Sequence, residues 1–81
     1  MQYTYPMSTY RISVAPVKEL AKKRGYTSIR SFSQAAGVPY GTAYRWWQDS
    51  VTQIHADTLA QIAEFFDVEP GDLLRKVPRD A

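Results

Sequence analysis

The pattern of apolar and polar positions changes its period at Pro16. Before this residue, Tyr10, Ile12 and Val14 alternate with polar residues, which predicts a short β-strand. After it, apolar residues recur at the spacing of three and four that places them on one face of a helix. We therefore expect an all-α domain preceded by a short N-terminal strand. Five short helices are expected, within residues 17–24, 27–37, 39–48, 55–68 and 69–77.

Residues with known preferences for helix ends mark these boundaries. A hydroxyl at Thr27 or Ser28 can accept the unpaired amide hydrogens of the second helix, and Gly37 can end that helix. Pro39 suits the first position of the third helix, because its missing N–H needs no partner there. Asp57 is favourably placed in the first turn of the fourth helix. The residues expected to face inward are Val17, Leu20, Ala21, Ile29, Phe32, Ala36, Ala43, Trp46, Leu59, Ile62, Ala63 and Phe66.

The predicted strand needs a partner, because one isolated strand is not stable in water. The segment "LLRKV", residues 73–77, alternates apolar and polar residues in a similar way and is one possible partner in the same chain. A second copy of the strand is the other, and would give a symmetric dimer. Tyr3, Tyr5 and Met7 would add apolar area to either arrangement. The remaining alternative is a flexible arm.

Length and composition describe one globular domain. The chain has 81 residues, of which 44% are apolar and 22% charged. It has no cysteine, which excludes disulfides, thiol catalysis and thiolate metal sites. No long apolar run and no leader-like N-terminus is present, so we expect a cytoplasmic protein without membrane contact. We expect an N-terminal arm (1–16), one domain (17–77) and a tail (78–81).

The net charge of +2 is unevenly distributed along the chain. Residues 1–48 carry seven basic residues and one acidic residue, whereas residues 49–81 carry three basic and seven acidic residues. This asymmetry indicates one surface that attracts a polyanion, with an inert dipolar surface as the alternative. Lys22, Lys23 and Arg24 are candidates for phosphate contacts, and a solvated lysine face is the competing interpretation.

A glycine turn at Gly37 separates the second and third predicted helices, which is the helix-turn-helix pattern. From about Val17 to Val77 the chain resembles the Cro and phage-repressor (XRE-like) family, whose fold is of the lambda-repressor type. The resemblance is carried by "SIRSFSQAAGV", "PYGTAYRWW" and "DTLAQIAEFFDVEPGDLL". It implies a compact five-helix domain, most like small single-domain members with an N-terminal strand. It also implies binding to double-stranded DNA, usually as a homodimer that regulates transcription.

The resemblance also implies which residues face DNA. The third helix would enter the major groove, with Tyr40, Gly41, Tyr44 and Arg45 toward base edges. The residues implied to lie at the phosphate backbone are Ser28, Arg30, Thr42, Gln53 and His55. Phosphate contacts supply affinity and register, whereas base contacts supply sequence specificity.

The chain departs from the family pattern at four positions. Pro39 replaces the usual Ser or Thr cap, so a hydroxyl–phosphate contact is lost, and His55 takes a cap usually held by Ser. Ile29 stands where a polar, phosphate-contacting residue is common. Trp47 stands where many members carry a Glu that pairs with a basic residue of the first helix. These departures affect base preference and the number of contacts rather than the fold.

The third helix carries more aromatic rings than one inward stripe can bury. At about 100° per residue, Trp46 shares a side with Ala43, and both are expected in the core. Trp47 is expected to be half-buried against the aliphatic stems of Lys22 or Lys23. The alternative for Trp47 is a contact with DNA or with a second copy of the chain.

The outward face of the same helix is the expected recognition surface. Tyr40 and Tyr44 lie one turn apart and point outward, where DNA contact competes with an ordinary exposed position. Arg45 can bind a guanine through two hydrogen bonds, or pair with Asp49 four residues later. Gly41 weakens the helix by about 1 kcal/mol relative to Ala, a cost that we link to close approach of the backbone to DNA.

Catalysis and metal binding have no support in the sequence. His55 is the only histidine and has no cysteine or carboxylate cluster beside it, so we expect no metal site. No nucleophile–base pair or phosphate-cradling glycine loop is present, so we expect neither an enzyme nor a cofactor.

Two function classes remain. The first is a dimeric repressor that reads a short palindromic site with helix 39–48 in the major groove, its half-sites about 34 Å apart. We expect such a dimer to form through the N-terminal segment and the fourth or fifth helix. The second is a protein-interaction module on the same fold, such as an antitoxin or anti-repressor, which binds a protein partner.

Overall fold

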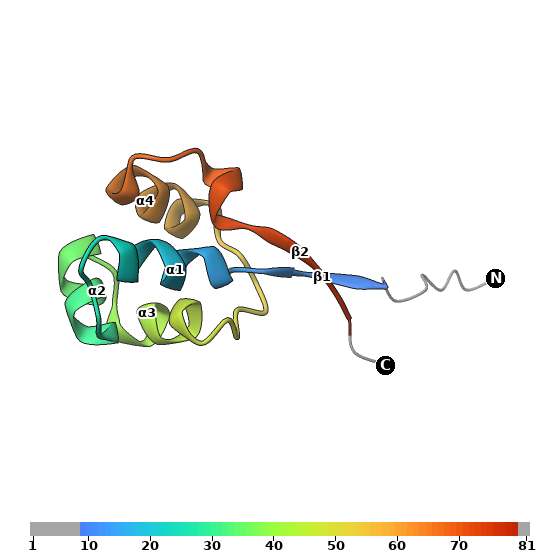
Figure 1. Cartoon of the computed structure of the whole chain (residues 1–81), viewed down its shortest axis with the longest axis horizontal. Coiled ribbons are helices and arrows are strands. Elements are labelled where there is room, and N and C mark those ends of the chain that lie inside the picture. Colours follow the sequence, from blue (N-terminus) through green and yellow to red (C-terminus); the bar gives the residue numbers. More distant parts are fainter. Residues whose placement is uncertain (1–8, 80–81) are drawn as a thin grey trace.

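Four α-helices and a two-stranded antiparallel ribbon make up the fold, which a computed structural model describes over residues 9–79 (Figure 1). None of the described helices is long and apolar enough to cross a bilayer. The elements in chain order are strand β1 (Tyr10–Ser13), helices α1 (Ala15–Lys23), α2 (Ile29–Ala36), α3 (Tyr40–Trp47) and α4 (Ala56–Phe66), the single 3₁₀ turn η1 (Pro70–Leu73) and strand β2 (Arg75–Pro78).

The prediction of a fifth helix is wrong. Residues Pro70–Leu73 form a 3₁₀ turn whose start is stabilised by a hydrogen bond from the Glu69 N–H to the Asp72 carboxylate, 3.1 Å. At Leu74 the backbone becomes extended, with φ −118° and ψ 145°, and it continues as β2. The alternation of apolar and polar residues in this segment therefore serves strand pairing, and the pairing with β1 overrides the local preference for a helix.

The ribbon joins the two ends of the described chain. β1 pairs with β2 in antiparallel register, with Arg11 opposite Val77 and Ile12 opposite Lys76. The Arg79 N–H donates to the Thr9 carbonyl oxygen at 3.0 Å and continues the ladder. Of the two partners open to the strand, the structure therefore contains the one in the same chain. Figure 1 shows the ribbon extending from one end of the helical body.

The ends of the predicted segments shift by one or two residues. α1 begins at Ala15, so Pro16 lies within its first turn, where a missing N–H has no cost. Pro78, expected to start the tail, lies in β2 opposite Tyr10. Tyr3, Tyr5 and Met7, together with the last two residues of the chain, lie outside the described residues.

Aromatic rings from three helices form the centre of the core. The ring of Phe32 in α2 stacks on Phe66 of α4 with centroids 5.9 Å apart, and lies 6.0 Å from the ring of Trp47. Trp46 and Ala43 are buried, which confirms the predicted inward side of α3. The remaining buried apolar residues are Val14, Val17, Ala21, Ala36, Val38, Ile62, Ala63 and Leu73.

The turn between α2 and α3 is held by hydrogen bonds on both sides. Gly37 ends α2 in the left-handed conformation, at φ 72°, which a residue without Cβ adopts at no steric cost. The buried Ser33 hydroxyl donates to the Val38 carbonyl oxygen at 2.7 Å. From α4, the Gln61 amide nitrogen donates to the carbonyl oxygens of Ala36 and Gly37, at 3.1 and 2.8 Å. These contacts fix α3 relative to α2 and α4.

Candidate nucleic-acid interface

One side of α3 is free of the core. Tyr40 and Tyr44 are 52% and 47% exposed, and Gly41 and Arg45 beside them are also exposed. The opposite side carries the buried Ala43, Trp46 and Trp47. The helix therefore exposes two phenol groups and one guanidinium on one side, as the sequence predicts.

The first turn of α3 lacks a side-chain cap. Pro39 occupies the N-cap position and Tyr40 is the first helical residue, so Pro39 stands one position earlier than expected. At Gly41, an added Cβ would meet nothing closer than a guanidinium nitrogen of Arg45, at 3.9 Å, which is an ordinary contact. Packing within the described chain therefore does not require glycine at this position.

A capping box stabilises the start of α2. Ser28 is the N-cap, and its hydroxyl oxygen accepts a hydrogen bond from the Ser31 N–H at 3.1 Å. The Ser28 N–H lies 3.3 Å from the Ser31 hydroxyl oxygen, which completes a capping box. Arg30, two positions after the cap, is exposed. The Ser28 hydroxyl is thus already engaged within the protein, whereas the Arg30 side chain faces solvent.

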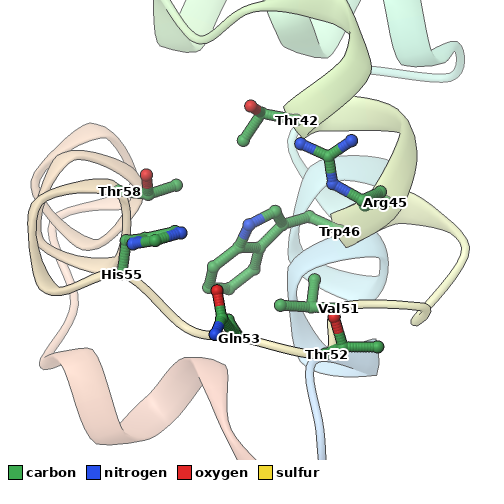
Figure 2. A pocket seen from close by; sticks show the side chains of 8 residues that line it. All are labelled: Thr42, Arg45, Trp46, Val51, Thr52, Gln53, His55 and Thr58. Carbon is green, nitrogen blue, oxygen red and sulfur yellow. The ribbon is translucent and has the colours of Figure 1, made fainter.

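A pocket beside α3 gathers four of the nine predicted site residues. Thr42 and Arg45 come from α3, and Gln53 and His55 from the loop that leads into α4 (Figure 2). The pocket has a volume of about 240 Å³, and we call it the α3–α4 pocket. Its full lining is Thr42, Arg45, Trp46, Val51, Thr52, Gln53, His55 and Thr58.

The other five predicted site residues do not line this pocket. Tyr40, Gly41 and Tyr44 lie elsewhere on α3, and Ser28 and Arg30 lie at the start of α2. The predicted site residues therefore lie in three places: the exposed side of α3, the α3–α4 pocket and the start of α2.

His55 occupies the N-cap position of α4, as the sequence predicts, but its side chain does not cap the helix. No hydrogen bond joins the imidazole to the first-turn amides. Figure 2 shows the ring directed across the α3–α4 pocket instead. The N-terminal amides of α4 thus lack the side-chain acceptor that Ser, Thr, Asp or Asn would supply.

Asp49 is a structural residue for which the sequence suggests a different partner. Its carboxylate accepts hydrogen bonds from the Val14 N–H at 2.7 Å, the Ser13 hydroxyl at 2.8 Å and the Arg11 guanidinium at 3.1 Å. The expected alternative for Arg45, an ion pair with Asp49, is therefore replaced by an ion pair between Asp49 and Arg11. This contact connects the end of α3 to the junction of β1 and α1.

The surroundings of Asp49 change its acidity. Burial alone would raise the pKa of its carboxyl group. The hydrogen bonds from Val14, Ser13 and Arg11, with the positive charge of Arg11, outweigh burial and lower this pKa below its ordinary value. Asp49 adopts a left-handed backbone, at φ 57°, directly after Gln48, the C-cap residue of α3. Its three donors lie 35 to 38 positions earlier in the chain, so no local spacing pattern reveals them.

The expected packing of Trp47 needs a correction. Its side chain is buried rather than half-buried, and the nearby ammonium is that of Lys18, 5.8 Å from the ring centroid. Lys22 and Lys23, the predicted neighbours, are exposed. The ring reaches further into the core than expected because Phe32 provides an aromatic contact there.

The side chain of Arg24 binds another part of the fold. Its guanidinium donates to the Phe66 carbonyl oxygen at 2.8 Å and lies over the ring of that residue, 5.7 Å from its centroid. The carbonyl groups in the last turn of a helix lack partners within the helix, so this contact satisfies one at the end of α4. Arg24 is therefore engaged by α4, whereas Lys22 and Lys23 keep their exposed positions.

A short α2, a glycine turn and an α3 with one exposed side define a helix-turn-helix protein. The family model of the Cro/C1-type HTH DNA-binding domain matches residues 17–79, and the chain belongs to this family. The solved structure of the transcriptional regulator VanUg is similar in fold, with a TM-score of 0.70 at 18% identity. That similarity covers 96% of this chain and 100% of the other. Comparison with curated protein sequences finds no match.

Proposed function

We propose that this chain is a sequence-specific regulator of transcription that inserts the exposed side of α3 into the major groove of DNA. The main observation in support is that Tyr40, Tyr44 and Arg45 of α3 are exposed, next to a pocket lined by polar donors. Membership of a DNA-binding family supports the same conclusion. The similar fold of VanUg, which is a transcriptional regulator, agrees with it.

Each predicted residue has a role in this proposal. Arg45 contacts a guanine, Tyr40 and Tyr44 pack on thymine methyl groups or donate to phosphate, and Gly41 lets the backbone approach. The residues proposed to contact phosphate are Ser28, Arg30, Thr42, Gln53 and His55. Ser28 would do so by exchanging one of its two capping contacts, because both its hydroxyl and its backbone N–H are already bonded to Ser31. Nothing in this proposal requires catalysis or a cofactor.

The proposed complex is a dimer on a short palindrome, acting as a repressor. One helix-turn-helix unit contacts few base pairs, and a two-fold dimer doubles the site with half-sites about 34 Å apart. The ribbon supports this arrangement, because a two-stranded sheet is marginal alone. It also exposes Tyr10 and Ile12, at 39% and 44%. Sedimentation of the protein alone and with a selected duplex tests the dimer, for which two chains per duplex are expected.

The salt dependence of binding to a random-sequence duplex tests the DNA-binding proposal. Fluorescence anisotropy is measured between about 50 and 200 mM salt for the wild type, for Arg30→Ala and for Lys76→Ala. Loss of one phosphate contact should make the salt slope shallower by about one unit for Arg30→Ala. Lys76→Ala removes the same charge from β2 and should leave the slope unchanged. Equal slopes for Arg30→Ala and the wild type would contradict the assignment of Arg30.

A second candidate function rests on a different surface. A groove of about 860 Å³ lies between β1 and the loop after α3, and its lining includes Ile12, Val51 and Ile54. Ile12 and Ile54 are 44% and 37% exposed, and apolar exposure of this kind suits a protein partner. This is the antitoxin or anti-repressor alternative. Capture from the native host distinguishes it, since a stoichiometric protein partner in the absence of DNA favours this function.

A further inference from the structure

The α3–α4 pocket contains a hydrogen-bond donor that has no acceptor among the described residues. The Trp46 side chain is only 3% exposed, and buried tryptophan N–H groups usually find a partner. Within residues 9–79 no atom accepts a hydrogen bond from the Trp46 indole nitrogen. No buried side-chain nitrogen or oxygen in that part of the chain is both unpaired and sealed from solvent, so this nitrogen reaches the pocket.

The view into the pocket agrees with this placement. In Figure 2 the indole nitrogen lies on the edge of the ring that faces the space between Thr42 and Thr58. The ring is held from behind by the core, so the donor cannot rotate away without breaking that packing. A buried donor fixed in this way is suited to bind a fixed acceptor.

The rim of the pocket attracts negative charge. Arg45 and His55 supply a cation and an imidazole, Gln53 an amide, and the threonines hydroxyl groups, while no carboxylate is among the lining residues. Asp57, in the first turn of α4, is not among them either. The N-terminus of α4 opens beside Thr58, where the helix dipole favours an anion and His55 provides no competing cap.

We infer that the α3–α4 pocket binds an oxygen of a phosphate group, with the Trp46 indole N–H as its innermost donor. The inference rests on the proposed function, because the source that we favour is a backbone phosphate next to the bases read by α3. Trp46 then has two functions: its ring closes the core under α3, and its nitrogen fixes the depth at which the helix enters the groove. Free inorganic phosphate offers the same oxygen chemistry, and the experiment separates the two sources.

The Trp46 indole signal of the ¹⁵N-labelled full-length chain provides the test. Its assignment uses Trp47→Phe, which removes the only other indole. A random-sequence duplex and inorganic phosphate are titrated separately at low salt, while anisotropy follows the duplex. The expected result is a saturable shift of the Trp46 N–H with DNA, and a smaller change at Trp47, which does not line the pocket.

Substitution provides a second readout. Trp46→Phe removes the donor and keeps an aromatic ring in the core. Loss of a hydrogen bond to a charged oxygen implies binding weaker by about ten- to hundredfold. Trp47→Phe removes the other indole N–H and should change the affinity less. Thermal unfolding of both variants shows whether they remain folded. The titration itself uses wild-type protein, for which Trp47→Phe serves only to assign the two indole signals.

The outcomes separate the inference from the proposed function. Duplex binding by anisotropy with an unchanged Trp46 signal overturns the inference and leaves DNA binding intact. No duplex binding even at low salt overturns the proposed function. In that case, a saturable shift with inorganic phosphate supports a pocket for a free anion, and no shift with either ligand rejects the phosphate site.

Discussion

At the scale of single residues, function and stability separate most clearly at two positions. Gly41 sits in a helix without any packing requirement for glycine. Asp49 lies just after α3, outside its exposed side. Its carboxylate accepts three hydrogen bonds that connect the end of α3 to β1 and the start of α1. We therefore interpret Gly41 as a residue that serves DNA binding, and Asp49 as a residue that stabilises the fold.

Replacing Gly41 by alanine should stabilise the protein and weaken DNA binding. Alanine is favoured over glycine by about 1 kcal/mol in a helix interior and by less in the first turn, where Gly41 lies, and the new methyl group meets only the end of the Arg45 side chain. The same methyl group would hold the backbone away from the bases. Urea unfolding and anisotropy measure the two effects on one sample. A more stable variant with unchanged affinity would show that DNA does not approach Gly41 closely.

The carboxylate of Asp49 makes stability depend on pH in the acid range. Because the folded-state pKa of Asp49 lies below its unfolded value of 3.8, its contribution is complete above that value and is lost as pH falls through the folded pKa. Asp49→Asn should therefore lower stability near neutral pH and reduce the loss of stability in acid. Asp49→Ala should cost about 1–3 kcal/mol, since the Val14 N–H and Ser13 hydroxyl lose their acceptor.

Unfolding curves at pH 7 and pH 3 measure this difference. Glu64→Gln, at an exposed position of α4 outside its first turn, is the matched control. If Asp49→Asn shows the same pH dependence as the wild type, the carboxylate does not hold the junction.

At the scale of secondary-structure elements, the sequence predicts local features better than pairings. Ser28, Gly37 and Trp46 take the predicted cap, turn and core positions, because hydroxyl caps, positive φ and helical period are local properties. The segment after Leu73 departs from the predicted helix, because its conformation depends on β1, which lies at the other end of the described chain and outside any local window. The lysines predicted beside Trp47 are the wrong ones, because the choice depends on how α1 crosses α3.

The contact between Gln61 and the end of α2 should control the rigidity of the helix-turn-helix unit. Gln61→Ala removes both hydrogen bonds to the carbonyl oxygens of Ala36 and Gly37, and should cost about 1 kcal/mol. Amide hydrogen exchange around Val38 should become faster than in the wild type. Gln34→Ala, at an exposed position of α2, provides the comparison. Equal exchange in the two variants would mean that the core alone holds the turn.

At the scale of the whole molecule, the positive and negative halves of the sequence are partly interleaved by folding. Arg11 pairs with Asp49, and Arg75 pairs with Glu19, so two cations of the chain are neutralised across the fold. Arg30 and Arg45, in α2 and α3, are exposed. The sequence predicts the helix-turn-helix class and the exposed side of α3, but not the α3–α4 pocket, whose walls come from α3, the loop after it and the first turn of α4 and meet only in the folded chain.

The central claim is that α3 reads base sequence. The most direct test compares affinity for a selected duplex with affinity for a random duplex, using the wild type and Arg45→Ala. Loss of one bidentate contact to guanine predicts a fall in this discrimination equivalent to about 1–3 kcal/mol, with weaker change in binding to the random duplex. Unchanged discrimination in Arg45→Ala would contradict the role of Arg45, and a wild type that shows no discrimination would contradict sequence reading by α3.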